Sequence, residues 1–214
     1  MMTLIFAYFF LLFITFLQVL IGSNATYSSW LLGLVVPFLS ICSVFGIVAL
    51  SKDKNWVEKE LYNSRGWWRV LFGVVLSFVV VGLFHLFWNN LAVSYGYTPL
   101  IFQLKEVKLI VTLVMQLSFY CLIEELLFRG FFQEEINKLV KHLPLSLSLF
   151  YQILIPTLLF CLMHSFKMGL GCLVIIVPSL FFGLLKYYSK NIYAAFGSHL
   201  IFNLYYSMLI GAPF

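Results

Sequence analysis

Seven long runs of apolar residues follow one another along the chain, separated by short polar stretches. Each run has about the 20 residues that an α-helix needs to cross the hydrocarbon core of a bilayer. The pattern predicts an all-α fold, a polytopic transmembrane helical bundle of about seven spans with the C-terminal four helices at its core. The predicted spans are Thr3–Gly22, Trp30–Leu50, Val70–Leu91, Leu109–Phe132, Leu147–Phe166, Met168–Tyr188 and Asn191–Gly211.

Two of the connecting stretches have a helical character of their own. Residues 51–69 mix charged side chains with tryptophans, which predicts a short helix in the headgroup layer. Residues 133–142 are expected to prolong the fourth span until Pro144 stops the helix. Because no repeat, low-complexity tract or linker interrupts the pattern, we expect residues 1–214 to form a single integral membrane domain.

The composition agrees with a membrane protein and excludes several other classes. Of the 214 residues, 63% are hydrophobic and only 10% are charged, whereas soluble domains have about 25% charged residues. This excludes a water-soluble globular enzyme and a nucleic-acid-binding module, and leaves membrane lipid as an expected partner. Ten of the 13 Lys and Arg residues lie near the ends of the second, fourth and sixth spans or in the connections after them. By the positive-inside rule, the N-terminus is predicted in the cytoplasm and the C-terminus outside.

Two acidic residues lie deep in an apolar run, where an ionisable group costs roughly 2.5–3.5 kcal/mol on insertion scales. They are Glu124 and Glu125 of the fourth span, and Arg129 follows on the same helix. Glu125 and Arg129 are four residues apart, a spacing that places them on one helical face and favours an ion pair. Glu124 faces another direction without a partner on its own helix. The spacing thus predicts a structural role for Glu125 and a reactive role for Glu124.

Polar residues of two later spans complete a set of candidate functional groups. His164 ends the fifth run, and His199 shares one face of the seventh span with Asn203, four residues further on. Gly197 and Ser198 are small enough to let another helix approach. His85, near Asn89 on the third span, is expected to make a hydrogen bond between helices.

One carboxylate, two imidazoles and one carboxamide suit the hydrolysis of an amide bond in a semi-dry cavity. Glu124 with His164 can hold and deprotonate a water, and His199 with Asn203 can stabilise the oxyanion. A divalent metal such as Zn, bound by Glu124, His164 and His199, is the alternative arrangement. Other intramembrane protease chemistries lack their residues, since the chain has no H-E-x-x-H, a single aspartate and no G-x-S-G.

The depth of His164 is a difficulty for a shared site. Counted from Leu147, His164 lies about 25 Å into its span, deeper than Glu124 and His199 lie in theirs. We therefore predict that the helix restarts near Pro156, which would bring His164 level with the other two residues.

At these residues the sequence resembles the CAAX-protease and bacteriocin-processing family of intramembrane proteases, related to type II CAAX prenyl endopeptidases. The family pattern E-E-x-x-x-R occupies 124–129, F-x-x-x-H occupies 160–164 and H-x-x-x-N occupies 199–203, all within residues 118–205. The resemblance implies proteolysis with Glu124, His164, His199 and Asn203 as catalytic residues. It also implies that Glu125, Arg129 and Phe160 support the site.

The resemblance carries expectations about biology as well. Members have been described both as metalloproteases and as metal-independent glutamate-dependent enzymes, and they cleave peptides or lipid-modified proteins. The short chain looks more like the bacterial members, which implies a plasma-membrane enzyme of bacteriocin or pheromone maturation or of self-immunity. Two alternatives stay open: a non-proteolytic scaffold or bacteriocin-immunity protein, and a small transporter or proton relay.

Overall fold

The computed structural model of the chain describes residues 7–8, 42, 44, 46–49, 55–62, 66–94 and 107–210. Within these ranges every regular element is a helix, as the apolar pattern predicts. The predicted spans Thr3–Gly22 and Trp30–Leu50 lie largely outside the described residues. The main helices are α3 (Trp56–Leu61), α4 (Trp67–Ser94), α5 (Val107–Glu125), η1 (Leu126–Phe132), α6 (Gln133–Val140), α7 (Leu145–Met168), η2 (Gly169–Ile175), α8 (Ile176–Ser189) and α9 (Ile192–Ile210).

The five later predicted spans are all helical. The third corresponds to α4, the fourth to α5 with the π-helix η1, the fifth to α7, the sixth to the 3-10 helix η2 with α8, and the seventh to α9. Three helical stretches in the described part of the chain are long and apolar enough to cross a membrane, namely Trp67–Phe87, Leu145–Phe166 and Gly169–Ser189. These stretches indicate an integral membrane protein, and the total of seven spans stays a prediction.

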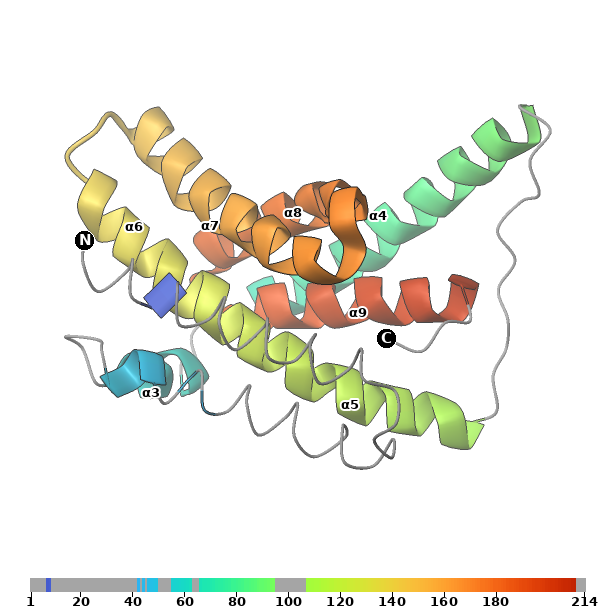
Figure 1. Ribbon diagram of the computed structural model, residues 1–214, viewed down its shortest axis with the longest axis horizontal. Coiled ribbons are helices and arrows are strands. Elements are labelled where there is room, and N and C mark those ends of the chain that lie inside the picture. The colour runs from blue at the N-terminus through green and yellow to red at the C-terminus, as the bar shows by residue number, and fades with distance from the viewer. Residues whose placement is uncertain are drawn as a thin grey trace.

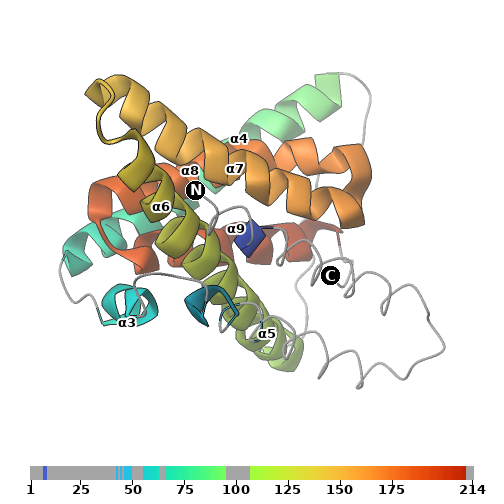
Figure 2. The same cartoon turned by 60° about the vertical axis from the view of Figure 1, so that its left-hand side comes forward.

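A long helical rod organises the bundle. Helices α5, η1 and α6 follow one another without interruption from Val107 to Val140, so the predicted extension of the fourth span is confirmed (Figure 1). The π-helix in the middle of the rod is not predicted by the sequence pattern. Such segments wind more widely than an α-helix and often occur at functional sites. Pro144 precedes α7, which turns back and packs against α6 (Figure 2).

The predicted restart of the fifth span at Pro156 is wrong. Helix α7 runs as one helix from Leu145 to Met168, with Pro156 inside it. A proline removes one backbone donor and introduces a steric clash, but contacts in a membrane bundle can satisfy the freed groups. The kink or break that the sequence suggested is therefore not required for the helix to continue.

The length of the rod explains the depth of His164 instead. The rod continues well past Phe132, the predicted end of the fourth span. Glu124 thus lies 16 residues, or about 24 Å, before the end of the rod at Val140. His164 lies 19 residues, or about 28 Å, after the start of α7 at Leu145. The rod and α7 are connected between Val140 and Leu145. Residues at similar distances from this connection, such as Glu124 and His164, therefore lie at a similar depth.

The interior of the bundle contains a cluster of phenylalanine rings, and the last helix, α9, packs against several others. The rings of Phe128, Phe131, Phe132 and Phe160 are almost completely buried, and α9 packs against α4, α5 and α8. A Cβ on Gly197 would lie 2.7 Å from Val74 Cγ2, so α9 and α4 approach closely at this glycine.

Two polar contacts join the same pair of helices, α4 and α9. Ser77 Oγ hydrogen-bonds Ser198 Oγ at 2.6 Å. His85 Nδ1 hydrogen-bonds Tyr205 Oη at 2.8 Å. The helix-to-helix hydrogen bond predicted for His85 is therefore confirmed.

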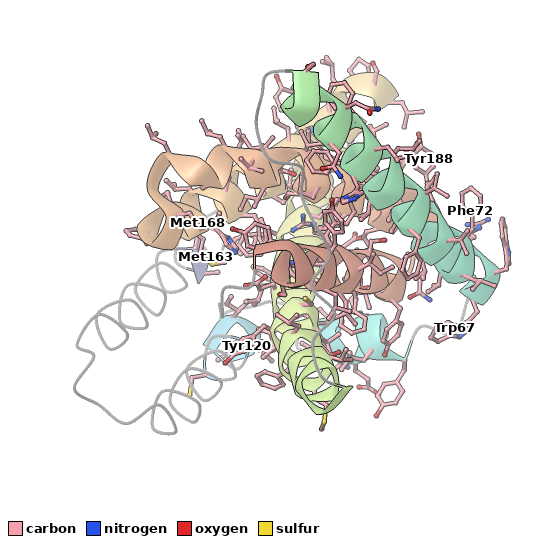
Figure 3. All side chains as sticks on the ribbon, turned by 90° about the vertical axis from the view of Figure 1, so that its right-hand side faces the viewer. Trp67, Phe72, Tyr120, Met163, Met168 and Tyr188 are labelled. Carbon is pink, nitrogen blue, oxygen red and sulfur yellow. The ribbon has the colours of Figure 1, made fainter. Side chains whose placement is uncertain are left out.

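The outer side of α4 is apolar. Phe72, Phe78 and Phe87 are each more than 60% exposed, and Figure 3 shows Phe72 projecting from the outside of the bundle. Side chains of this kind suit contact with lipid tails rather than with water. Glu124, His164 and His199 lie instead on α5, α7 and α9.

Candidate active site

Side chains from three helices meet beside the carboxylate of Glu124, the last residue but one of α5. Glu124 Oε1 lies 3.9 Å from Nε2 of His164 on α7. Glu124 Oε2 lies 3.6 Å from Nε2 of His199 on α9. Each oxygen of this carboxylate therefore faces a different imidazole ring. The structure brings together the carboxylate and the two rings that the sequence singled out.

The ring of His164 is held by its own helix. Nδ1 lies 2.9 Å from the carbonyl oxygen of Phe160, one turn earlier on α7. A carbonyl oxygen only accepts hydrogen bonds, so Nδ1 carries the hydrogen, and in the neutral ring Nε2 is the acceptor that faces Glu124. The Phe160 ring packs 4.3 Å from the His164 ring, between centroids. Phe160 thus supports His164 through both its backbone and its side chain.

The ring of His199 is held by a second carboxylate. Nδ1 lies 2.8 Å from Glu125 Oε1, so the two nitrogens of this ring face the two consecutive glutamates. The ring of Phe182 on α8 stacks on His199 at 4.9 Å between centroids, and Phe160 lies edge-on at 5.8 Å. A carboxylate that accepts from one ring nitrogen fixes the orientation of the imidazole and the position of its hydrogen.

Glu125 is also part of a buried ion pair. Arg129 Nε lies 3.4 Å from Glu125 Oε2, which confirms the pairing that the four-residue spacing predicts. Arg129 Nη2 donates to both the carbonyl oxygen and Oγ of Ser179 on α8, at 2.9 and 2.8 Å. Glu125 and Arg129 are 0% and 1% exposed. The pair is therefore held in an interior where a charge without such partners would be costly.

Asn203 lies one turn after His199 on α9. Its Nδ2 donates to Cys121 Sγ on α5 at 3.2 Å, and Cys121 precedes Glu124 by three residues. The contact places the carboxamide beside the same stretch of α5. In the described contacts its amide nitrogen faces this thiol rather than Glu124 or an imidazole.

Exposure divides the site into two parts. The side chains of Glu124 and His164 are 26% and 21% exposed, whereas those of His199 and Glu125 are 5% and 0% exposed. The first two side chains can therefore meet water or a substrate. Glu125 is buried behind His199, and Nε2 of His199 faces the exposed carboxylate of Glu124.

The described residues do not form a metal-binding cluster. In this part of the chain no group of three or more His, Cys, Asp or Glu side chains is placed to hold a metal ion.

Sequence reasoning did not find three residues that contact the site. Ser179 and Phe182 lie in an otherwise apolar run, and Cys121 is one of four cysteines in such runs. Serine and cysteine are common in membrane helices, so their presence alone gives no signal. The spacing of Ser179 and Phe182, three residues apart on one helical face, becomes informative only once Arg129 and His199 are known to lie against that face.

The comparisons agree with the motif analysis. Residues 106–205 match the family model described as type II CAAX prenyl endopeptidase Rce1-like, which confirms the resemblance inferred from the motifs. The match contains the whole candidate site, from Cys121 to Asn203, and begins just before α5. Searches of the curated proteins and of the solved structures give no match. The match covers a little under half of the chain, and the family that it describes is one of proteases.

Proposed function

We propose that this chain, whose residues 106–205 belong to the type II CAAX prenyl endopeptidase Rce1-like family, is an intramembrane endopeptidase that uses a glutamate-activated water. The observation that carries the proposal is the placement of Glu124. Its two oxygens face two imidazole rings from separate helices, at 3.9 and 3.6 Å, and its side chain is partly exposed. The proposed substrate is a peptide or a lipid-modified protein.

The separation of Glu124 and His164 suits a bridging water. At 3.9 Å the two heavy atoms are too far apart for a direct hydrogen bond, which needs about 2.7–3.2 Å. One water can lie within hydrogen-bond distance of both Glu124 Oε1 and His164 Nε2. Because both atoms accept, such a water donates one hydrogen to each and turns its lone pairs towards the substrate.

The proposed chemistry then follows general-base hydrolysis. Glu124 takes a proton from the water as its oxygen attacks the scissile carbonyl carbon, and the carbonyl oxygen becomes an oxyanion. His199 donates to this oxyanion from Nε2, which requires hydrogens on both ring nitrogens because Nδ1 already donates to Glu125. Asn203 donates the amide hydrogen that does not bond Cys121 Sγ. When the carbon–nitrogen bond breaks, the proton on Glu124 passes to the leaving amine, and the carboxylate is regenerated.

The cellular role is proposed from the family and the topology. We infer an enzyme of a bacterial plasma membrane that acts in bacteriocin or pheromone maturation or in self-immunity. The N-terminus would lie in the cytoplasm, as the distribution of basic residues predicts.

The test is cleavage by the purified chain in lipid nanodiscs. The probes are a fluorogenic peptide that ends in a farnesylated C-a-a-X sequence and the same peptide without the lipid. We expect wild type to cleave, and E124Q and H199A to lose at least about 100-fold in kcat. E134Q is the matched control, because Glu134 is a partly exposed acid on the same rod, outside the candidate site.

The alternatives give different results in the same experiment. A scaffold or immunity protein would cleave neither peptide, and E124Q would keep the phenotype of the wild type in cells. A proton relay would lose ion-coupled flux in E124Q without any cleavage by the wild type. Cleavage that survives in E124Q would contradict the proposed role of Glu124.

A further inference from the structure

Helix α8 carries no residue of the three sequence motifs, yet it contacts the site at two places. Ser179 accepts two hydrogen bonds from Arg129, and Phe182 stacks on His199. The two residues are three apart, so they lie on the same face of α8. Ser179 is 0% exposed and Phe182 is 2% exposed. This face of α8 therefore contacts both Arg129 and His199, which are linked to each other through Glu125.

The guanidinium of Arg129 is held from several directions. Nη2 donates to the carbonyl oxygen and Oγ of Ser179, and Nε faces Glu125 Oε2. The rings of Phe160 and Phe182 lie 5.1 and 5.9 Å from Cζ, measured to their centroids. Among these partners of Arg129, the Ser179 hydroxyl is an uncharged side-chain acceptor. Because the donor is charged, this hydrogen bond belongs to the stronger class in proteins.

A movement of Arg129 would be transmitted to the imidazole of His199. The Glu125 carboxylate is rigid, and its two oxygens serve different partners: Oε2 faces Arg129 and Oε1 accepts from His199 Nδ1 at 2.8 Å. If the guanidinium shifts, the carboxylate plane turns and the hydrogen bond to Nδ1 changes length. The direction of His199 Nε2 towards Glu124 changes with it.

We propose that Ser179 is a positioning residue for the proposed hydrolysis, acting on His199 through Arg129 and Glu125. The expected effect of Ser179 on cleavage rests on the proposed function. Its expected effect on the orientation of His199 rests on the contacts alone. In this arrangement, a residue of α8 fixes the orientation of the His199 imidazole on α9. Ser179 itself touches neither the water nor the substrate.

The first arm of the test measures cleavage of the farnesylated peptide in nanodiscs by S179A, S179T and S189A. Loss of the hydroxyl leaves the backbone carbonyl as the one Ser179 acceptor for Arg129. A misplaced catalytic group can lower the rate by up to about 100-fold, so we expect S179A to reduce kcat by about 10- to 100-fold and to change KM less than about twofold. S179T keeps the hydroxyl and should recover most of the rate.

S189A is the matched control. Ser189 is also buried on α8, but its Oγ bonds the backbone of Asn191 at the far end of the helix. S189A should therefore keep the wild-type kcat. Equal losses of kcat in S179A and S189A would overturn the proposal, because they would show a general effect of a lost buried hydroxyl.

The second arm is independent of any protease activity. In protein labelled with ¹⁵N-histidine, the Nδ1–H of His199 that donates to Glu125 should give a downfield proton signal, assigned with H199Q. We expect this signal to shift or disappear in S179A, to return in S179T and to stay unchanged in S189A. An unchanged His199 signal in folded S179A would overturn the proposal. If wild type cleaves no peptide but the signal responds as expected, the proposed function fails while the positioning of His199 by Ser179 stands.

Discussion

The buried pair of Glu125 and Arg129 leads to a quantitative prediction about stability. Both side chains are almost completely buried, and Arg129 Nε lies 3.4 Å from Glu125 Oε2. R129M removes the positive charge and leaves Glu125 with His199 as its remaining ionic partner in the described contacts. Removal of one member of a buried ion pair costs about 3–5 kcal/mol. We expect R129M to lower the free energy of unfolding by about this amount.

The opposite substitution should cost less. In E125Q, Arg129 keeps two acceptor oxygens of Ser179 and the faces of two aromatic rings. The loss is then close to that of a hydrogen bond to a charged group, about 1.5–3 kcal/mol. The double variant E125Q/R129M leaves no unpaired charge, so its cost should fall below the sum of the two single costs by about 1–3 kcal/mol.

The assay is equilibrium unfolding by SDS in mixed micelles, followed by tryptophan fluorescence. The control is the pair of Glu135 and Lys138 on α6, whose side chains are 28% and 57% exposed. Because solvent screens an exposed pair, K138M should cost at most about 1 kcal/mol. The reasoning is refuted if R129M costs no more than K138M, or if E125Q and R129M are additive within about 0.5 kcal/mol.

Three further predictions test separate features. G197A places a Cβ 2.7 Å from Val74 Cγ2, so we expect a loss of about 1–3 kcal/mol in the same titration, partly restored by V74A. Burial raises the pKa of Glu60 on α3, and Lys186 lowers it by a smaller amount. The folded chain then binds this proton more tightly than the unfolded chain, so wild type should lose stability relative to E60Q as pH rises from about 4.5 through the raised pKa. Dialysis against EDTA should leave peptide cleavage unchanged, because in the proposed mechanism Glu124 activates the water directly; a loss that Zn restores would favour the metal-bound alternative.

Residue spacing predicted the contacts that form between residues of the same helix. Glu125 and Arg129 are four residues apart, and their ion pair follows from the angle between them. The apolar runs likewise predicted the helices α4, α5, α7, α8 and α9, because a membrane span has to be apolar over about 20 residues. The motifs also predicted that Glu124 lies beside His164 and His199, and the contacts agree. The amide of Asn203 instead contacts Cys121.

Contacts that depend on how one helix is rotated against another were not predictable. The sequence pairs Glu125 with Arg129 but does not show that its other oxygen accepts from His199. The role of Ser179 depends on the rotation of α8 about its axis, which a nearly uniform apolar run does not specify. The error at Pro156 has a related origin, because the edge of the apolar run at Phe132 does not mark the end of the rod, which lies at Val140.

The two adjacent glutamates owe their different environments to their positions on one helix. Consecutive residues of an α-helix point about 100° apart, so both cannot face the same neighbour. Glu125 points into the interior and holds Arg129 and His199, and at 0% exposure it cannot reach a substrate. The side chain of Glu124 is 26% exposed. It faces Nε2 of His199, whereas Glu125 contacts Nδ1 of the same ring. Since one imidazole lies between both carboxylates, a change at the buried glutamate must alter the ring that the exposed glutamate faces. The variant E125Q should therefore lower kcat of any cleavage by wild type even though Glu125 touches no substrate.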